Sequence, residues 1–355
     1  MRTSARGFIL YSYNNFVGIY KNMKKIVFSN VFSLVLGCIC LLVCIFYPFV
    51  KVEDKNLSSN SGYKAIITVW QIDSFEGGVG SRTSFLRNVT SEYHKKNKDV
   101  LFLVVSHTVS SATLAIQQGK IPDVISYGNC GLDLAGIAKN MGTTKDTDGG
   151  VVNGKRYAYP WLKGYYFYIT HKNSNKNKVD KTFVVENETY SGALALIGEN
   201  TSVKNAVFMQ SKECLVNFKS NKNSALVGTQ RDIVRLRSQE VLFDAVPISN
   251  FCDLYQYASI TTKSDSKFSY CQSFIEYLIS DDVQRKLVNL KMFSVNGVSL
   301  YGEDKIFLQA EKSVVKYTLS PFMTKNQIVE IKNQAKECVL QSKGQEELIK
   351  LFKQL

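Results

Sequence analysis

Residues 153–170 read NGKRYAYPWLKGYYFYIT. A Gly turn leads into a run of aromatic side chains, which are Tyr157, Tyr159, Trp161, Tyr165, Tyr166, Phe167 and Tyr168. Aromatic residues favour β-strands, but Pro160 cannot donate a ladder hydrogen bond and Gly164 weakens a strand. The pattern therefore predicts a segment that passes between two bodies. Flat aromatic faces beside backbone kinks suit stacking against a sugar ring, and an aromatic core strand is the alternative.

The composition is that of a globular protein with a large core. The chain has 355 residues and 45% hydrophobic content, which leaves room for about two domains. The formal net charge is +14, and five basic residues lie before residue 51, where no acidic residue occurs. The other charges are dispersed, with no recognised nucleic-acid motif. We therefore expect solvated lysines and no nucleic-acid partner.

The cysteines and histidines show no pattern typical of a reactive site. Three of the eight cysteines lie in one apolar run, and the other five are scattered without CxxC spacing, at Cys130, Cys214, Cys252, Cys271 and Cys338. We interpret these five mainly as small buried side chains. The three histidines stand far apart in the sequence. The sequence therefore predicts no catalytic residue, no metal site and no cofactor, although catalytic triads can assemble in space.

The N-terminal part predicts a membrane segment. Residues 26–50 are nearly all apolar, and about 20 such residues cross a bilayer as a helix, whereas signal-peptide cores run about 7–15. We expect residues 1–25 to be a cytoplasmic segment, with Met23 as an alternative start, and residues 26–50 to be a membrane anchor. A lipoprotein box ending at Cys38 and a cleaved signal sequence are the alternatives. In each case residues 51–355 lie outside the cell membrane by the positive-inside rule.

A polar tether over residues 51–63 leads into a pattern typical of a parallel sheet. Residues 65–72, 100–105 and 124–127 are apolar, β-branched runs, and residues 81–96 and 110–118 between them have helical spacing. This alternation predicts a parallel sheet covered by helices.

Four motifs, in order along the chain, resemble one protein family. They are GKIPDVI (119–125), NGKRYAYPW (153–161), FIEYLISDDVQRKL (274–287) and KMFSVN (291–296). The chain resembles the family 1 extracellular solute-binding proteins of ABC transporters, a maltose-binding-protein-like group that mostly handles sugars and oligosaccharides. It departs from the usual pattern at GTQRDIVRL (228–236), where family members carry a glycine-rich aromatic segment.

The resemblance implies an α/β fold with two lobes, the type II periplasmic-binding-protein-like fold, and a ligand cleft between the lobes. Lobe one would comprise residues 64–160 and 255–302, and lobe two residues 161–254 and 303–355. Ligands of open α/β sheets bind beyond the carboxyl ends of strands. Three stretches meet this condition, and together with the aromatic crossover they supply the expected ligand-binding residues, which are Trp70, Asp73, Glu76, Gly78, Arg82, Tyr127, Trp161, Tyr165, Gln230 and Arg231.

Each of these assignments has a structural alternative. The stretch around Asp73 and Glu76 also fits the acidic start of a helix, and Arg231 with Asp232 fits a surface ion pair. If the ligand carries a carboxylate, Arg231 would be its best partner, because a guanidinium binds carboxylates through two hydrogen bonds.

The expected function is that of a membrane-tethered receptor with a monomeric ectodomain. It would bind a carbohydrate, close around it and deliver it to the permease subunits of an ABC importer, without being an enzyme. One alternative is a surface glycan hydrolase that uses Asp73 and Glu76 as paired carboxylates. Another is a scaffold or sensory ectodomain that keeps the binding fold without transport.

Overall fold

The structure is a computed structural model, and it describes residues 62–74, 78–146, 148–172, 179–199, 203–342 and 344–352. The chain divides into two compact units, Met1–Ser59 and Asn60–Leu355. The first unit, and with it the expected membrane segment and most of the tether, lies outside the described residues. Among the residues that are described, no helix has both the length and the apolar character needed to span a bilayer.

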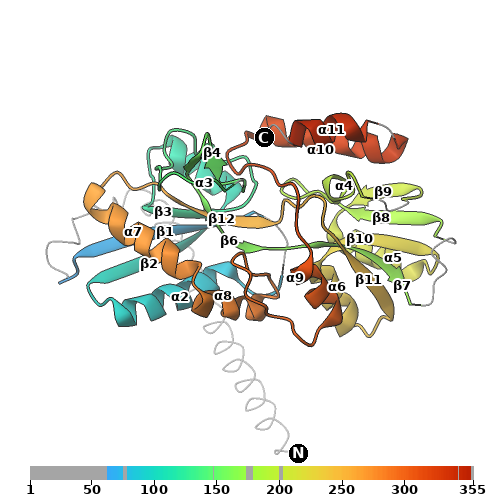
Figure 1. The fold of residues 1–355 in the computed structure, drawn as a ribbon, viewed down its shortest axis with the longest axis horizontal. Helices are drawn as coiled ribbons and strands as arrows, with labels where there is room; N and C mark the ends of the chain where they lie inside the picture. The colour runs from blue at the N-terminus through green and yellow to red at the C-terminus, as the bar shows by residue number, and fades with distance from the viewer. Residues whose placement is uncertain are drawn as a thin grey trace, which may run out of the picture. The chain divides into compact units, whose positions relative to one another are not determined.

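The sheet of lobe one contains five strands, in the order β2-β1-β3-β12-β6 (Figure 1). The strands are β1 (Ala65–Asp73), β2 (Val100–Thr108), β3 (Val124–Tyr127), β6 (Tyr159–Lys163) and β12 (Tyr255–Ile260). Strands β1, β2 and β3 are parallel, as the sequence pattern predicts, and β12 runs antiparallel to both β3 and β6. Strand β6 reaches Lys163, three residues past the boundary expected for lobe one.

Helices cover both faces of this sheet. Helices α2 (Arg82–Lys96) and α7 (Asp265–Leu278) contact β1 and each other, and α3 (Val109–Gln117) packs on the opposite face. Ser81 begins α2, and its side chain accepts a hydrogen bond from Ser84 N, which is the expected role of a serine at this position. Two short helices, α8 (Asp281–Gln284) and η4 (Arg285–Leu290), follow α7.

Asp123 of the GKIPDVI motif ties three strands of lobe one together. Its carboxylate accepts hydrogen bonds from Thr68 N (2.9 Å) beside it on β1 and from the Thr262 hydroxyl (2.7 Å) just after β12. Lys267 on α7 forms an ion pair with the same carboxylate at 3.1 Å. A buried carboxylate is stable only with such partners, so this motif residue serves the fold.

Lobe two has a second five-stranded sheet, in the order β11-β7-β10-β8-β9. Its strands are β7 (Tyr166–His171), β8 (Lys181–Val185), β9 (Ala206–Met209), β10 (Ser224–Thr229) and β11 (Phe243–Ile248). Its helices are α4 (Gly192–Ala195), α5 (Ser211–Ser220), α6 (Gln230–Ser238) and α9 (Lys305–Lys312). A two-stranded hairpin, β4 (Val151–Val152) with β5 (Lys155–Arg156), precedes the crossing into this lobe.

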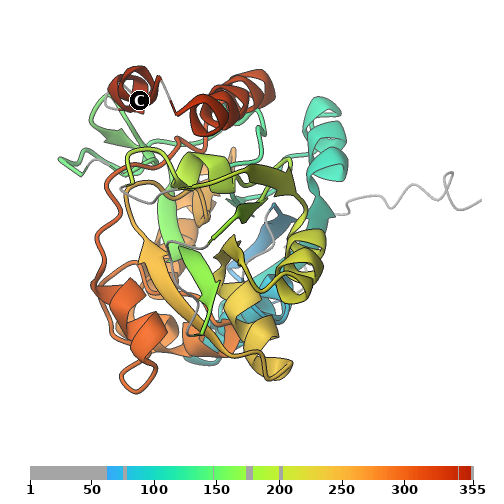
Figure 2. The same ribbon diagram turned by 90° about the vertical axis from the view of Figure 1, so that its right-hand side faces the viewer.

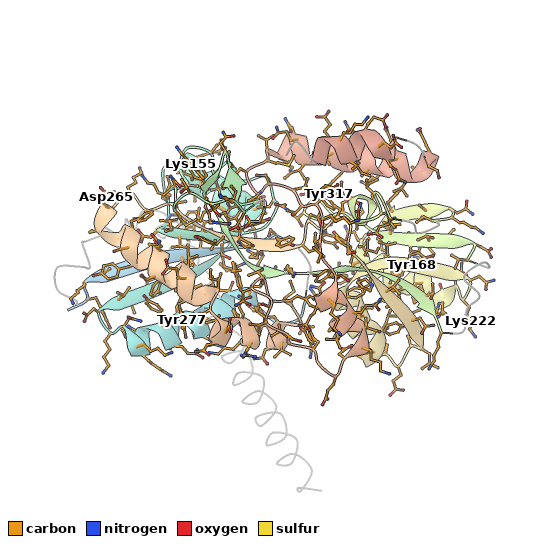
Figure 3. All side chains as sticks on the ribbon, viewed as in Figure 1. Lys155, Tyr168, Lys222, Asp265, Tyr277 and Tyr317 are labelled. Atoms are coloured by element: carbon orange, nitrogen blue, oxygen red, sulfur yellow. The ribbon has the colours of Figure 1, made fainter. Side chains whose placement is uncertain are left out.

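The C-terminal helices α10 (Lys325–Gln341) and α11 (Gln345–Phe352) pack on each other, and α10 packs on α4 of lobe two. Both views show them together at one edge of the molecule (Figures 1 and 2). With both sheets in place, the expected two-lobe α/β architecture is confirmed. Figure 3 shows the side chains of the two lobes, with Tyr277 on α7 of lobe one and Tyr168 on β7 of lobe two.

The chain crosses between the two sheets twice, and the outgoing and return segments lie next to each other at Gly164 and Leu254. Gly164, between β6 and β7, donates its N–H to Leu254 O of the return crossing at 2.6 Å, and Lys163 forms an isolated bridge with Phe293. A Cβ on Gly164 would lie 2.8 Å from Gln230 Nε2 and 2.9 Å from Leu254 Cβ. Only glycine permits this approach, which explains the break in the aromatic run.

Trp161 is part of the core at this crossing. It is fully buried, its ring stacks on Phe85 of α2 with centroids 5.7 Å apart, and its Nε1–H donates to the Ser126 hydroxyl at 3.0 Å. Buried hydrophobic side chains of both lobes form one continuous cluster through Trp161, Leu162 and Tyr165. The crossing is therefore held by packing as well as by backbone hydrogen bonds.

We expect Trp161→Ala to lower the free energy of unfolding by about 3–5 kcal/mol, because it leaves a large cavity and removes a buried hydrogen bond to the Ser126 hydroxyl. Urea denaturation of the full chain measures this loss. Trp70, the other tryptophan of the chain, is only partly buried, so Trp70→Ala is the matched control and should cost less. An equal cost for the two variants would contradict the packing role of Trp161.

Candidate functional site

The carboxyl ends of the parallel strands of the two sheets meet near the crossings. In lobe one, β1 ends at Asp73 and β3 at Tyr127, and in lobe two, β8 ends at Val185 and β10 at Thr229. We call the residues at and directly after these strand ends the interlobe edge. Its described residues are 73, 74, 78–82, 128–131, 186–191 and 229–235. Strand ends are where open α/β sheets place their ligands.

Among the described residues, two side-chain hydrogen bonds connect the lobes at this edge. Asn129, just after β3, donates its side-chain N–H to Asp253 O at 3.2 Å. Gln230, at the start of α6, donates its side-chain N–H to the Met292 sulfur at 2.9 Å, and Gly78 lies against the same Met292. The loop after β1 and the start of α6 therefore share one neighbour, although they belong to different lobes.

Asp253 is the centre of a buried polar cluster at the crossing. Its carboxylate accepts hydrogen bonds from the Tyr166 hydroxyl (2.7 Å) and from Ser191 N (3.0 Å), and Asp253 is 1% exposed. Burial raises the pKa of Asp253 to about 6, although these hydrogen bonds and the charge of Lys332 oppose the increase. The cluster joins β7, the loop after β8 and the return crossing at one point.

Glu186 extends this cluster toward the C-terminal helices. Its carboxylate accepts a hydrogen bond from the Ser191 hydroxyl at 2.9 Å, and its other oxygen lies 3.7 Å from Lys336 Nζ of α10. Burial raises the pKa of Glu186 to about 7, with Lys336 opposing the increase. Lys332 of α10 donates to the carbonyls of Asn187 (3.1 Å) and Glu188 (2.9 Å), so α10 holds the loop that follows β8.

The raised pKa values predict a pH dependence of stability. A carboxyl group whose pKa is higher in the folded than in the unfolded protein lowers the free energy of unfolding as the pH rises from the unfolded to the folded pKa. For Glu186 this range extends from about 4 to about 7. Glu186→Gln removes one such group. Relative to the wild type, its free energy of unfolding should therefore increase from pH 5 to pH 8, by on the order of 2 kcal/mol. Urea titrations across that range measure the difference, and a pH-independent difference would contradict the raised pKa.

Gly78 permits the close approach of the loop after β1 to the end of η4. Its φ is +68°, and a Cβ there would lie 2.2 Å from Leu290 O and 2.7 Å from the Met292 sulfur. Val79 N donates to Leu290 O at 2.7 Å, which fixes the loop in this position. Gly78 thus positions the interlobe edge through its backbone.

Gly78→Ala should lower the free energy of unfolding by about 1–3 kcal/mol, because it combines a left-handed backbone with a steric clash. Gly80→Ala is a matched control. Gly80 also has a positive φ, +75°, but its Cβ would make only an ordinary contact with Leu290, at 3.6 Å. Denaturation of both variants should show the larger loss for Gly78→Ala, and the reverse order would overturn the role of this close approach.

An arginine lies beside Asp73 on the lobe-one side of the edge. Arg82 is the first residue of α2, and its guanidinium lies 3.7 Å from the Asp73 carboxylate. The Arg82 side chain is 11% exposed, whereas that of Asp73 is 58% exposed and also accepts a hydrogen bond from Ser106 at 3.3 Å. Burial lowers the pKa of Arg82, Asp73 raises it, and the positive charge of Arg231 lowers it further. The two arginines therefore lie within electrostatic range of each other.

The lobe-two side carries two arginines on α6. Thr229 and Asp232 form a capping box, in which Asp232 accepts from Thr229 N at 2.8 Å. The other oxygen of Asp232 accepts from the Ser211 hydroxyl at 2.7 Å and pairs with Arg235 at 3.4 Å. Asp232 is fully buried, whereas Arg231, one residue before it, is only partly buried.

Four of the expected ligand-binding residues are fully buried and hydrogen-bonded within the protein. The Tyr127 hydroxyl pairs with the Ser259 hydroxyl at 2.9 Å, and that of Tyr165 donates to Ser313 O at 2.9 Å. The Gln230 side chain accepts from Tyr165 N at 3.0 Å and donates to Met292. With Trp161, these side chains present no surface to a ligand in this conformation. Their ligand-binding roles stay predictions, and their burial favours structural roles.

Of the other described candidates, Gly78 is buried, and the remaining four keep some exposed surface. Asp73 is exposed, and Trp70, Arg82 and Arg231 are partly buried. Trp70 packs against His107 of β2, with ring centroids 4.2 Å apart. Glu76 lies outside the described residues.

Three residues of this region escaped sequence reasoning, namely Asn129, Glu186 and Asp253. Glu186 follows the apolar strand TFVV directly, and Asn129 comes two residues after Tyr127, so the strand-end rule that selected the other candidates would also have found them. Asp253 lies in a crossing segment, FCDLY, with no strand-end signal. The Asn129 side-chain oxygen is buried without a hydrogen-bond partner.

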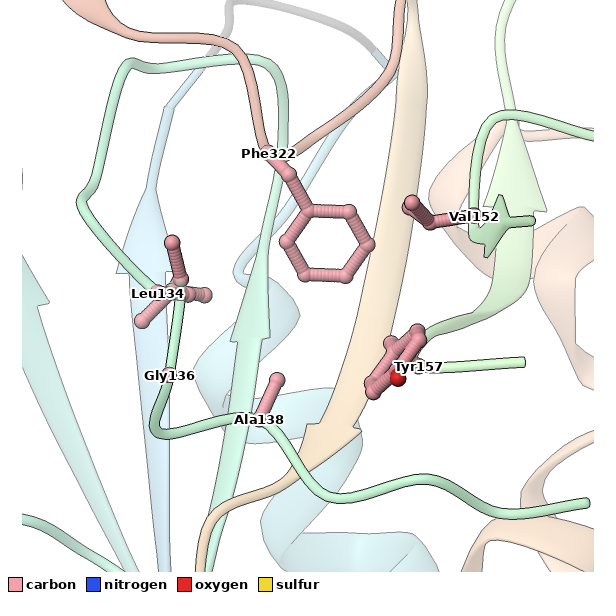
Figure 4. Close-up of a pocket in the computed structure, with 7 residues that line it drawn as sticks. Leu134, Gly136, Ala138, Val152, Tyr157 and Phe322 are labelled. Atoms are coloured by element: carbon pink, nitrogen blue, oxygen red, sulfur yellow. The ribbon is translucent and has the colours of Figure 1, made fainter. Parts of the chain in front are cut away.

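An apolar pocket of about 300 Å³ lies elsewhere, between residues of lobe one and Phe322 (Figure 4). Tyr157, Leu134 and Phe322 contribute its largest side chains, and Ala135, Gly136, Ala138 and Val152 complete the lining. Its lining side chains are uncharged, and the Tyr157 hydroxyl is the one polar side-chain group among them, so the pocket offers few groups that could orient a sugar.

No family model matches the chain, and no curated protein matches its sequence. Solved structures match its fold. Maltodextrin binding protein MalE1 from L. casei BL23, without ligand, has a TM-score of 0.53 and 13% identity, over 80% of this chain and 95% of that chain. Maltose-bound MalE3 from T. maritima has a TM-score of 0.55 and 13% identity, over 81% and 97%. The sugar-binding protein MalE from Xanthomonas citri has a TM-score of 0.54 and 10% identity, over 81% and 95%.

These structural neighbours are maltodextrin- and sugar-binding proteins of the solute-binding kind. The resemblance found in the four sequence motifs is therefore confirmed at the level of the fold.

Proposed function

We propose that this protein is an extracellular carbohydrate receptor of an ABC importer. It binds a sugar, most simply an oligosaccharide, at the interlobe edge, closes around it and delivers it to the permease subunits. Residues 26–50 tether it to the membrane, and the ectodomain acts as a monomer. Binding and release need no catalytic residue.

The observation that carries this proposal is the meeting of two sets of strand ends on a fold shared with sugar-binding proteins. The edge combines a carboxylate, Asp73, with arginines from both lobes, Arg82 and Arg231. Carboxylates and guanidinium groups form hydrogen bonds with sugar hydroxyls. Trp70, three residues before Asp73 on β1, is a partly buried aromatic side chain, and aromatic faces stack on sugar rings.

The crossings provide a mechanism for closure. The polar cluster around Asp253 lies where β7 and the return crossing meet, so it is a fixed point about which the lobes can rotate. A ligand that contacts both lobes favours the closed form, because only that form makes both sets of contacts. The permease can then distinguish loaded from empty receptor by its conformation.

The direct experiment is a thermal-unfolding screen of the purified full chain against neutral and acidic mono- and oligosaccharides. A ligand at 100 times its dissociation constant adds about 2.7 kcal/mol to the stability of the native state. We expect at least one sugar to raise the midpoint of unfolding, and Arg231→Gln to reduce that increase.

Trp161→Phe serves as the control for nonspecific effects. Because Trp161 is buried away from the edge surface, this variant should lower the midpoint without ligand but keep the ligand-induced increase. Stabilisation by amino acids, peptides or metal ions and by no sugar would contradict the carbohydrate proposal. Stabilisation by none of these ligands would favour a scaffold or sensory ectodomain, and hydrolysis of an oligosaccharide in the assay would favour an enzyme.

A further inference from the structure

Helix α10 contacts both lobes. Its first residue, Lys325, lies against Gly131 of the loop after β3 in lobe one, where a Cβ on Gly131 would be 2.7 Å from Lys325 Cα. Further along the helix, Lys332 donates to the carbonyls of Asn187 (3.1 Å) and Glu188 (2.9 Å), which follow β8 in lobe two. One continuous helix of 17 residues therefore connects strand ends of the two lobes.

The two attachments of α10 differ in kind. At lobe one, the helix begins against the backbone of Gly131, whose φ is +69°, and Phe322 just before the helix packs on Tyr157 with ring centroids 6.2 Å apart. At lobe two, the attachment is polar and buried, since Lys332 is 4% exposed. A rigid helix attached to two bodies restrains their rotation, because rotation has to break one of the attachments.

Glu186 lies at the lobe-two attachment. It is 8% exposed, and one of its oxygens accepts a hydrogen bond from the Ser191 hydroxyl. The other oxygen has no hydrogen-bond partner and lies 3.7 Å from Lys336 Nζ of α10. A buried carboxylate that lacks hydrogen bonds favours its neutral form. Because lysines of α10 face this carboxylate, separation of α10 from the loop would give it access to water.

The surroundings of Glu186 determine its protonation. Burial has the largest effect and raises the pKa of Glu186 to about 7, Lys336 and Lys332 of α10 lower it, and Asp253 of the return crossing raises it. Tyr166 of β7 also lies within electrostatic range, but burial raises its pKa well above the usual range, so it is neutral. The docked helix therefore favours the protonated form of Glu186, in spite of the two lysines.

We propose that α10 is a pH-sensitive strap between the lobes, which docks on the loop after β8 when Glu186 is protonated and loosens when Glu186 is ionised. The state of a protein that binds a proton more tightly is favoured at low pH. Docked Glu186 binds its proton more tightly than a glutamate in water, whose pKa is about 4.3. Raising the pH from 6 to 8 therefore lowers the ratio of docked to undocked helix about tenfold. The lobes rotate more freely at the higher pH, whatever the ligand is.

Hydrogen exchange of the full chain in detergent, without ligand, tests this proposal after correction for the intrinsic effect of pH on exchange. Between pH 6 and pH 8 the opening equilibrium of residues 325–341 should increase about tenfold. The loops at 128–131 and 186–191 should follow, because α10 contacts both. Helix α7 of lobe one is the internal reference and should change less.

Glu186→Gln should remove most of this pH dependence, because it keeps the shape of the side chain and removes the titrating group. Glu188→Gln is the matched control. It removes the same charge from the same loop, but Glu188 is exposed, so the wild-type pH dependence should remain. Lys336→Gln removes a charge that lowers the pKa of Glu186, so it should shift the transition to higher pH. A purely structural role of Glu186 would produce no such shift.

The proposal falls if exchange of α10 in the wild type does not depend on pH relative to α7, or if Glu186→Gln and Glu188→Gln behave alike. It also falls if α10 responds to pH while the loop at 128–131 does not, because α10 would then not couple the lobes. No sugar is present in these experiments, so their outcome is separate from that of the thermal screen that tests the proposed function.

Discussion

The buried carboxylate of Asp253 connects the parts of the chain that have to stay in register for the two lobes to act together. It accepts hydrogen bonds from Tyr166 at the start of β7 and from Ser191 after β8, and its own carbonyl accepts one from Asn129 after β3. An ionised carboxylate this deeply buried is costly unless it is paired, so the surrounding groups are constrained to these positions. The strand ends of both lobes are thereby held near one another.

The second constraint is the close packing of the crossings. Gly164 lies against Gln230 and Leu254, and Gly78 lies against Leu290 and Met292, in each case closer than a side chain would allow. These contacts bring Gln230 of lobe two and the loop after β1 to the same methionine. This backbone geometry also positions two arginines of the edge. Arg82 comes four residues after Gly78, and Arg231 directly follows Gln230.

The parallel β-α-β order of lobe one and the interruption at Gly164 were predictable, because they depend on periodicity and on residues with unusual backbone preferences. The two-lobe architecture was expected from the resemblance of four motifs to a family of solute-binding proteins. The roles of the aromatic residues were harder to predict. Trp161 and Tyr165 have the chemistry of a sugar-binding surface, but the chain also needs large side chains to fill the space at the crossing, and sequence alone does not distinguish the two uses. Asp253 could not be found for a related reason, since its partners come from residues 129, 166 and 191.

The central claim is that the ligand lies at the facing strand ends. Hydrogen exchange of the full chain, measured with and without a stabilising sugar, tests this claim most directly. The account predicts added protection in residues 78–82, 128–131 and 229–235, together with little change around Leu134 and Phe322, which line the apolar pocket. Protection confined to that pocket, with the strand ends unchanged, would contradict it.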